Sequence, residues 1–422
     1  MRRWAAGAAI TLMAPLALTA CGFFGSDDAG TGSTPESPTS SEAAQTGEQD
    51  TGQTSDQASS GGGSVASPDD AKAPAEVTIA AIGDILAHSR LNLTANEYAG
   101  YAEGKYNYDP MFADVAPLIS SADLSLCHME TPLSPDNTNL SIPDILSFNT
   151  PHEMATALAK AGIDGCDFAS NHTMDRGIDG LADTEQVIRD AGLGYAGPSA
   201  HEDRAGKAEF YDVKGVTVAH LAYTYTFPNS GGPTTDIPGE APWLIDASWP
   251  SIGSEGILQQ SAKAKAEGAD FVVVSMHWGG EYQAAPLDEQ LQIADDLLSS
   301  DDVDLILGTH VHVIQPCQRI NGKDVIYGLG NFLSNQSPDT ASVLLPATQE
   351  GMVAIFTLKR DADGVVTTEM SYQPTRVEIT PGTKPGPHIV RLVGPDNYPQ
   401  TWERTTATVD LLGGCDQLVL QP

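Results

Sequence analysis

Five short polar clusters in this chain each follow a strand-like apolar run. The last of them, residues 308–312, comes directly after the run at 303–307 and carries His310 and His312 two positions apart. Ligands of α/β sheets collect just beyond the carboxyl ends of strands, and two histidines at this spacing can turn their rings toward one cavity. The other four clusters are Gly83-Asp84, His128-Met129-Glu130, Ser170-Asn171-His172 and Met276-His277-Trp278. Together the five predict a polynuclear metal site.

The residue types in these clusters indicate the chemistry. Imidazoles and carboxylates suit Mn, Zn or Fe, so we expect two divalent metal ions. The residue types do not select among these three metals. Glu130 offers two oxygens that can bridge such ions, and ions about 3.5–4 Å apart can brace an in-line displacement. His172 stands beside the candidate ligand Asn171 and can donate a proton to a leaving group. Asp175 can orient His172 or can cap the following helix.

The elements that must position these clusters alternate between strands and helices. Strands are expected at 77–82, 123–127, 163–168, 216–223, 271–276 and 303–307, and helices at 109–121, 150–161, 178–191, 255–267 and from Pro286. This alternation favours an α/β fold with largely parallel pairing. After Pro316, runs at 325–328, 352–358 and 365–372 predict a second, antiparallel sheet, and residues 381–422 predict an irregular C-terminal extension.

The N-terminal residues resemble a bacterial lipoprotein signal. Arg2 and Arg3 precede a short Ala-rich apolar stretch, and Cys21 follows Ala20. The signal peptide would be residues 1–20, and cleavage would leave Cys21 as the lipidated first residue. An ordinary secretory signal with a chance cysteine is the alternative. Residues 21–75 are rich in Ser, Thr and Gly and poor in apolar side chains, so they predict a disordered tether before a domain at 76–380.

Charge and cysteine content restrict the partners. The chain has 21 Lys and Arg against 56 Asp and Glu, a net charge of −35, which opposes nucleic acid at long range. Bound divalent ions could still attract an anion locally. Four cysteines remain once Cys21 is set aside, and an even number in an exported protein favours disulfides. We expect Cys127–Cys166, because both lie near the ends of strands that feed one site, and Cys317–Cys415.

Several motifs in this order resemble one known family. They are Gly83-Asp84, Glu130-Thr131-Pro132-Leu133, the run at 169–177, the run at 277–282, the histidine pair of 308–312 and Tyr327-Gly328-Leu329-Gly330-Asn331-Phe332. The set, over about residues 77–337, resembles the poly-γ-glutamate capsule-synthesis (CapA/PgsA-type) family of the calcineurin-like metallophosphoesterase superfamily. The resemblance implies a four-layer α/β/β/α sandwich with a two-metal site at the strand ends.

The resemblance also implies roles for single residues. The implied metal ligands are Asp84, Glu130 as the bridging residue, Asn171, His277, His310 and His312. His172 matches the histidine that acts on the reacting phosphate. The first motif of the superfamily is Asp-x-His, whereas the nearest histidine here is His88, which is either a ligand on a longer loop or a surface residue.

Four further residues are expected around the site. Trp278, Glu281 and Tyr282 follow a ligand directly and should line the entrance, although Trp278 could equally belong to the core. Asn331, from the last motif, should lie behind the ligands or face the substrate. The remaining histidines match no motif and are assigned structural or surface roles: His128, His152, His201, His220 and His388.

These patterns predict a lipid-anchored, extracytoplasmic protein of capsule or surface-polymer biosynthesis. Its metallophosphoesterase-like domain would act as a two-metal hydrolase on a phosphoester or an anionic polymer, in contact with a membrane synthase complex. Poly-γ-glutamate is implied by the resemblance, and nothing else in the sequence selects it. The alternative is a non-catalytic, membrane-tethered assembly subunit that binds the nascent polymer or the synthase. His172 favours catalysis, because a structural metal site has no need of a proton donor.

Overall fold

The computed structural model describes residues 73–422, apart from 144, 230–231, 380–386, 414–417 and 421–422. The signal peptide, Cys21, nearly all of the tether and Cys415 lie outside the described residues, so the lipid anchor and the Cys317–Cys415 disulfide stay predictions. Among the helices of the described part, none combines the length and the apolar character needed to cross a bilayer.

The larger of two main sheets has the strand order β16-β15-β14-β1-β2-β5-β6, with β13 beside β1 and β17 beside β15. Its strands are β1 (Ala75–Leu86), β2 (Leu124–Met129), β5 (Gly165–Asp167), β6 (Gly194–Ala196), β13 (Asn331–Ser334), β14 (Glu350–Arg360), β15 (Val366–Ile379), β16 (His388–Leu392) and β17 (Leu418–Val419). Strands β1, β2, β5 and β6 pair in parallel, whereas β14, β15 and β16 add antiparallel strands on the other side of β1.

The smaller sheet has the order β11-β12-β10-β9-β8-β7. Its strands are β7 (Glu209–Val213), β8 (Val216–Thr224), β9 (Phe271–His277), β10 (Leu305–Thr309), β11 (Cys317–Ile320) and β12 (Lys323–Ile326). The four central strands pair in parallel and the two edge strands pair antiparallel. A separate two-stranded ribbon joins β3 (Leu133–Ser134) to β4 (Thr150–Pro151).

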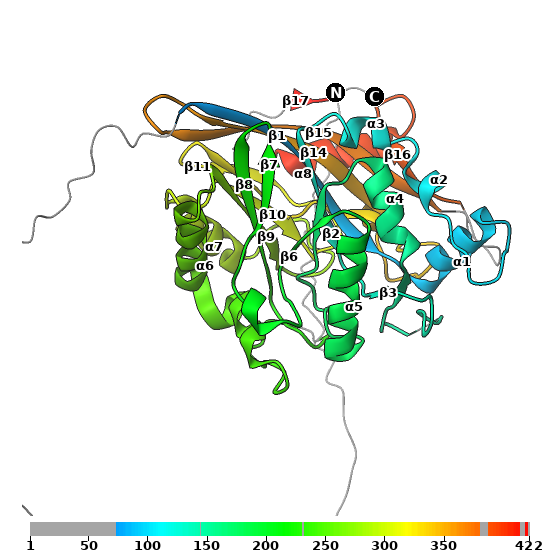
Figure 1. Ribbon diagram of the computed structural model, residues 1–422. Coiled ribbons are helices and arrows are strands. Elements are labelled where there is room, and N and C mark those ends of the chain that lie inside the picture. Colours follow the sequence, from blue (N-terminus) through cyan, green and yellow to red (C-terminus); the bar gives the residue numbers. More distant parts are fainter. Residues whose placement is uncertain (1–72, 144, 230–231, 380–386, 414–417, 421–422) are drawn as a thin grey trace, which may run out of the picture. The chain divides into compact units, whose positions relative to one another are not determined.

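Helices cover the outer faces of both sheets (Figure 1). Helices α4 (Glu153–Ala161) and α5 (Gly177–Asp190) pack on the larger sheet, and α6 (Trp249–Ala266) and α7 (Asp288–Leu298) pack on the smaller one. Between the sheets, Ile79 and Leu126 of one share a buried cluster with Phe271 and Leu305 of the other. The predicted four-layer α/β/β/α order is therefore confirmed. The remaining helices of the described residues are α1 (Ser89–Tyr98), α2 (Asp109–Phe112), α3 (Ala116–Ile119), α8 (Pro399–Val409) and three short 3-10 helices at Glu202–Arg204, Pro242–Ala247 and Pro346–Gln349.

Several predicted elements differ from the structure. The helix expected over 109–121 is split into α2 and α3, because Pro117 in the first turn of α3 lacks the N–H that a continuous helix would need. The expected second antiparallel sheet does not form as a unit. Strand β12 joins the smaller sheet, and β14 and β15 join the larger one, where β14 satisfies the backbone groups along the edge of β1.

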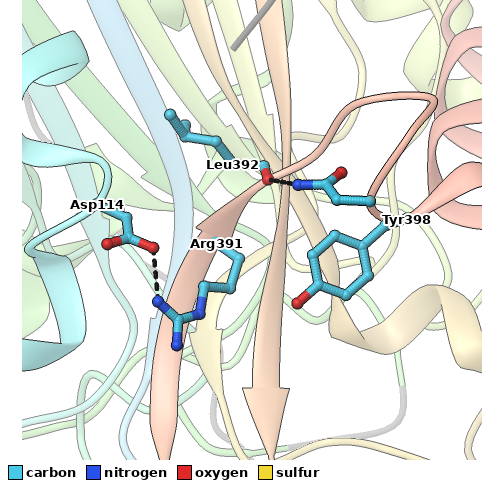
Figure 2. Close-up of a pocket in the computed structure, with 5 residues that line it drawn as sticks. Asp114, Arg391, Leu392 and Tyr398 are labelled. Atoms are coloured by element: carbon cyan, nitrogen blue, oxygen red, sulfur yellow. Dashed lines mark hydrogen bonds and ion pairs between the residues drawn. The ribbon is translucent and has the colours of Figure 1, made fainter.

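The C-terminal extension is regular where we expected it to be irregular. Strand β16 pairs with β15, and α8 follows it. Arg391 of β16 donates hydrogen bonds to Asp114 and to Glu378, each at 2.7 Å, so this strand is tied both to its neighbour and to the turn between α2 and α3 (Figure 2). The cavity that Arg391 and Asp114 line, with Leu392, Asn397 and Tyr398, includes none of the predicted site residues.

Candidate metal centre

Close backbone approach at the end of β10 shapes the loop that carries two histidines. A Cβ at Gly308 would lie 1.9 Å from the carbonyl oxygen of Tyr327, so only glycine fits there. Beyond it, His310 (φ 87°) and His312 (φ 58°) both adopt the left-handed conformation. This conformation costs a non-glycine residue roughly 1–2 kcal/mol, and such strain is typical of functional sites.

Two overlapping groups of buried side chains lie at the carboxyl ends of the strands. One contains Asp84, His128 and Glu130, and the other contains Glu130, His277 and His310. Within each group, the potential ligand atoms lie within 4.8 Å of one another. Glu130 belongs to both, as expected of a residue that bridges two ions.

The polar atoms of these groups fit a bound cation. Among the described residues, both carboxylate oxygens of Glu130, Nε2 of His128 and Nδ1 of His310 are buried without a hydrogen-bond partner. Burying a carboxylate or an imidazole nitrogen in this way is costly, and native structures rarely leave such atoms unsatisfied. Divalent cations that accept imidazole and carboxylate ligands would satisfy all of these atoms.

His312 and Asn331 lie against the first group. Nδ1 of His312 is 2.9 Å from Oδ2 of Asp84 and 3.2 Å from Oδ1 of Asn331, and its Nε2 is 3.6 Å from Oε1 of Glu130. The last distance is within ion-pair range but too long for a hydrogen bond. Asn331 is fully buried and also donates to Gln336, so it lies behind the ligands.

Asn171 lies against the second group. Its Oδ1 is 3.0 Å from Nε2 of His277, and its Nδ2 donates to Oδ1 of Asn229 at 3.0 Å. The amide oxygen therefore faces the same region as the imidazoles of that group. With Asp84, Glu130, His277, His310 and His312, Asn171 completes the set of predicted ligands, and the fold brings all six together.

Burial and neighbouring charges set the protonation of the histidines in opposite directions. Burial lowers the pKa of His277 and of His310 well below the ordinary value, so both are neutral, as metal ligands must be. Burial also disfavours charge on His128 and His312, but nearby carboxylates outweigh it and raise the pKa of His128 to about 9 and that of His312 to about 10. A cation that bound either ring would therefore have to displace one of its protons. Burial raises the pKa of Glu130.

The predicted proton donor sits beside these groups with its expected partner. Nδ1 of His172 is 2.9 Å from Oδ2 of Asp175, and the same oxygen accepts a hydrogen bond from the backbone of Phe148 at 2.6 Å. Asp175 does not cap the following helix, since Arg176 holds that position. Its contact therefore fits the orienting role rather than the alternative.

His88 belongs to neither ligand group and is half-buried. Its Nδ1 is 3.1 Å from the carbonyl oxygen of Leu86, its ring contacts the ring of Phe148, and burial lowers its pKa to about 4. The longer loop after Asp84 therefore turns this ring toward the edge of the site.

Of the two positions expected for Trp278, the structure shows the core and not the entrance. Its ring is fully buried under α6 and α7, and its Nε1–H donates to the carbonyl oxygen of Tyr327 at 2.9 Å. The side chain following His277 on its strand points to the opposite face, which is the core. Glu281 is exposed, and Tyr282 is half-buried with its ring 6.0 Å from that of His312.

A cavity of about 620 Å³ opens beside the site. His88, Tyr282 and Gln336 line its inner part. Much of the remaining lining is apolar, and several of these side chains are more than half exposed: Leu93, Ile142, Leu146 and Val343.

Three residues of the candidate site are not among those predicted from the sequence. His128 is expected to be structural, yet it belongs to a ligand group. Asp167 forms a hydrogen bond with His128. The ring of Tyr225 packs 4.5 Å from the ring of His310. A signal for His128 was present, because it stands two positions before Glu130, the spacing that drew attention to His310 and His312. We know of no comparable signal for Asp167 or Tyr225 in the sequence.

The fold and these groups define an α/β protein with a candidate metal centre at the ends of its parallel strands. The family described as "Bacterial capsule synthesis protein PGA_cap" matches residues 78–336, and the chain belongs to this family. The predicted family is thereby confirmed.

Two Bacillus relatives carry names of the same kind. "Capsule biosynthesis protein CapA" of Bacillus anthracis is 29% identical over 62% of this chain and 60% of its own length. "PGA biosynthesis protein CapA" of Bacillus subtilis is 28% identical over 65% of this chain and 64% of its own. The match thus spans somewhat less than two thirds of either relative. Among solved structures, the calcineurin-like phosphoesterase YfkN of Bacillus subtilis gives a TM-score of 0.42 at 16% identity, covering 79% of this chain and 98% of that one.

Proposed function

We propose that this protein is a membrane-anchored, metal-dependent hydrolase of capsule or surface-polymer synthesis. Its substrate would be a phosphoester or an anionic polymer of the poly-γ-glutamate type. One observation carries the proposal: two buried ligand groups share Glu130, and their unpaired polar atoms suit a pair of divalent cations. The names of the two Bacillus relatives support the polymer.

The residues around the ligand groups divide the chemical tasks between them. Bound divalent ions would supply Lewis acidity and a nucleophile at neutral pH. Asp175 accepts a hydrogen bond from Nδ1 of His172 and so holds this ring with Nε2 available to a substrate. When both nitrogens of this ring carry a proton, Nε2 can give its proton to the leaving oxygen while Nδ1 keeps its hydrogen bond to Asp175. His88 and Tyr282, which line the adjoining cavity, are placed to contact the substrate beside the reacting bond.

Hydrolysis of a simple phosphodiester, bis(p-nitrophenyl) phosphate, by the full chain with Mn²⁺ or Zn²⁺ tests the activity. Poly-γ-glutamate serves as the second substrate. We expect turnover that EDTA abolishes and that the exposed-residue variant His201→Ala retains. If the metal-loaded chain cleaves neither substrate, the hydrolase proposal fails and the assembly-subunit alternative replaces it.

The resemblance of the N-terminal residues to a lipoprotein signal and the disulfide both support the proposed location. Cys127 and Cys166 are bonded, and disulfides persist outside the reducing cytoplasm. Several acyl chains on Cys21 would hold the protein firmly at a membrane. Changing Cys21→Ser should move the protein from the membrane fraction to the soluble fraction. A variant that stays in the membrane fraction after signal cleavage would disprove the lipid anchor.

A further inference from the structure

We propose that His128 is a direct metal ligand, and that Asp167 is the positioning residue that presents its Nε2 to the ion. This inference deepens the proposed function and rests on it for the presence of metal. It adds the imidazole of His128 to the carboxylates of Asp84 and Glu130, against which His312 also lies.

The backbone sets these three residues side by side. In the parallel ladder of β1 and β2, Asp84 and His128 are direct partners. Glu130 comes two positions after His128, and its backbone N–H donates to the carbonyl oxygen of Ile85 at 3.2 Å, which holds it at the same edge. Side chains two positions apart on an extended chain point to the same face, so His128 and Glu130 share one face. The group therefore needs no movement of the backbone to form.

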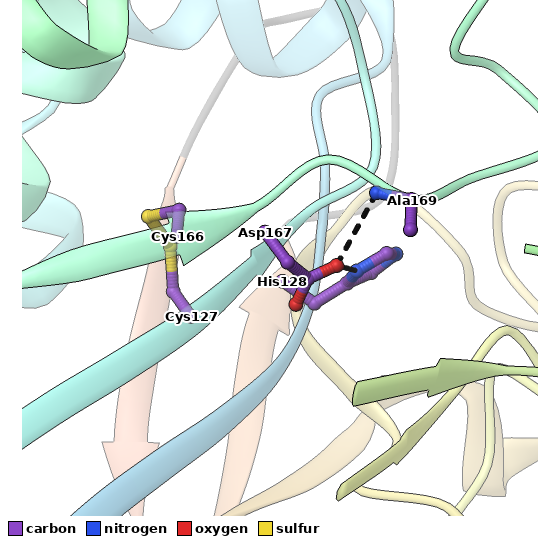
Figure 3. Close-up of a disulfide and its surroundings, with 5 residues drawn as sticks. All are labelled: Cys127, His128, Cys166, Asp167 and Ala169. Carbon is purple, nitrogen blue, oxygen red and sulfur yellow. Dashed lines mark hydrogen bonds and ion pairs between the residues drawn. A yellow bond between two sulfur atoms is a disulfide. The ribbon is translucent and has the colours of Figure 1, made fainter. Parts of the chain in front are cut away.

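Asp167 fixes how the His128 ring is turned. Its Oδ1 is 2.7 Å from Nδ1 of His128, and the same oxygen also accepts a hydrogen bond from the backbone of Ala169 at 3.3 Å (Figure 3). A carboxylate at Nδ1 keeps the proton on that nitrogen and leaves the lone pair of Nε2 available. This arrangement is the usual support for a metal-bound histidine.

A disulfide holds this pair in register. Cys127 is opposite Cys166 in the ladder of β2 and β5, and the next pair along is His128 opposite Asp167. The bond between the cysteines thus lies one residue before the contact between the imidazole and the carboxylate (Figure 3).

A purely structural ion pair between His128 and Asp167 would not explain the environment of Nε2 of His128. Asp167 satisfies Nδ1 only, and Nε2 is buried with no hydrogen-bond partner among the described residues. One ring nitrogen of His128 lies within 4.8 Å of a carboxylate oxygen of Asp84 and of Glu130. Because Asp167 takes up Nδ1, Nε2 is the nitrogen with a lone pair left for a cation. The His128 ring also packs 4.8 Å from the ring of His277, so the two ligand groups adjoin. A cation satisfies Nε2 and both carboxylates at once.

Anomalous diffraction from wild-type crystals soaked in Mn²⁺ or Zn²⁺ tests the inference without any variant. We expect a peak about 2.0–2.3 Å from Nε2 of His128, the bonding distance of such ions to imidazole. A peak at the centre that lies beyond bonding distance from Nε2 would overturn the inference.

Metal titrations of the full chain give a second test. His128→Gln should lose one of two Co²⁺ equivalents, and Asp167→Asn should weaken that equivalent roughly 10–100-fold. His220→Gln is the matched control, because His220 is equally buried but contacts Ser275 instead of a ligand group. Unchanged stoichiometry and affinity in His128→Gln would overturn the assignment.

The two proposals fail in different ways. A wild type that shows metal at Nε2 but hydrolyses no substrate would refute the hydrolase and leave His128 a ligand. A wild type that hydrolyses a phosphodiester with no metal at Nε2 would refute only the inference. A chain that binds no metal would refute both.

Discussion

The two ligand groups share Glu130 but are built differently. The group of Asp84, His128 and Glu130 comes entirely from the larger sheet, where the ladder of β1 and β2 sets the spacing. The second group takes His277 and His310 from the smaller sheet and Glu130 from the larger one. The first group therefore depends on strand register, and the second depends on how the two sheets pack together. Variants in each group separate these two dependences, and those at the shared residue should have the largest effect on bound metal.

Removing the shared carboxylate should affect both groups. Glu130→Gln keeps the size of the side chain but removes the negative charge that two cations would share, so we expect the loss of both metal equivalents. Metal analysis of the purified variant measures this directly. A variant that keeps one tightly bound equivalent would show that Glu130 does not bridge.

Removing a ligand of the smaller sheet should affect one group only. His310→Gln takes away an imidazole whose Nδ1 is buried and unpaired among the described residues, and we expect one equivalent to be lost and one retained. Calorimetric titration with Mn²⁺ distinguishes one site from two. Loss of both equivalents in this variant would show that the two ligand groups do not bind metal independently.

Breaking the disulfide should loosen the first group more than the second. The double variant Cys127→Ala/Cys166→Ala opens a crosslink with a sequence separation of 39. In the chain-entropy model such a loop contributes about 4 kcal/mol to stability. We expect a lower melting temperature and weaker metal binding at the His128 site, and little change at the His310 site. Equal weakening at both sites would contradict the separate origins of the two groups.

Removing the proton donor should leave metal binding intact. His172→Ala takes away the ring that Asp175 orients and no member of either group, so both equivalents should remain. Turnover should fall by about 10²–10⁴-fold, the usual effect of losing a general acid. Parallel measurement of metal content and phosphodiester hydrolysis checks both parts. Full activity in this variant would remove His172 from the mechanism.

The sequence predicted the features of the site that depend on the order of strands along the chain. It missed the features that depend on which strands pair and in what register. Parallel strands place their carboxyl ends at one edge, so the polar clusters after them had to converge. The spacing of His128 and Glu130 was a local signal for a ligand, but the support of His128 by Asp167, 39 positions away, depends on a strand register that no local pattern reveals. Trp278 could not be placed because an aromatic residue after a ligand suits either face of the sheet. Strand β16 was missed because its five residues follow a segment rich in Pro and Gly.

The pairing of β1 with β14 also has a consequence for the order of folding. Strand β1 is the first element of the described chain, and its antiparallel partner begins at Glu350, after both ligand groups are already in the sequence. During synthesis, one edge of β1 therefore stays open until most of the chain has emerged. Contacts between such distant segments slow folding, and an open apolar edge can pair with other chains meanwhile. Completion of the larger sheet must accordingly be a late step, and a chain truncated before β14 would retain that exposed edge permanently.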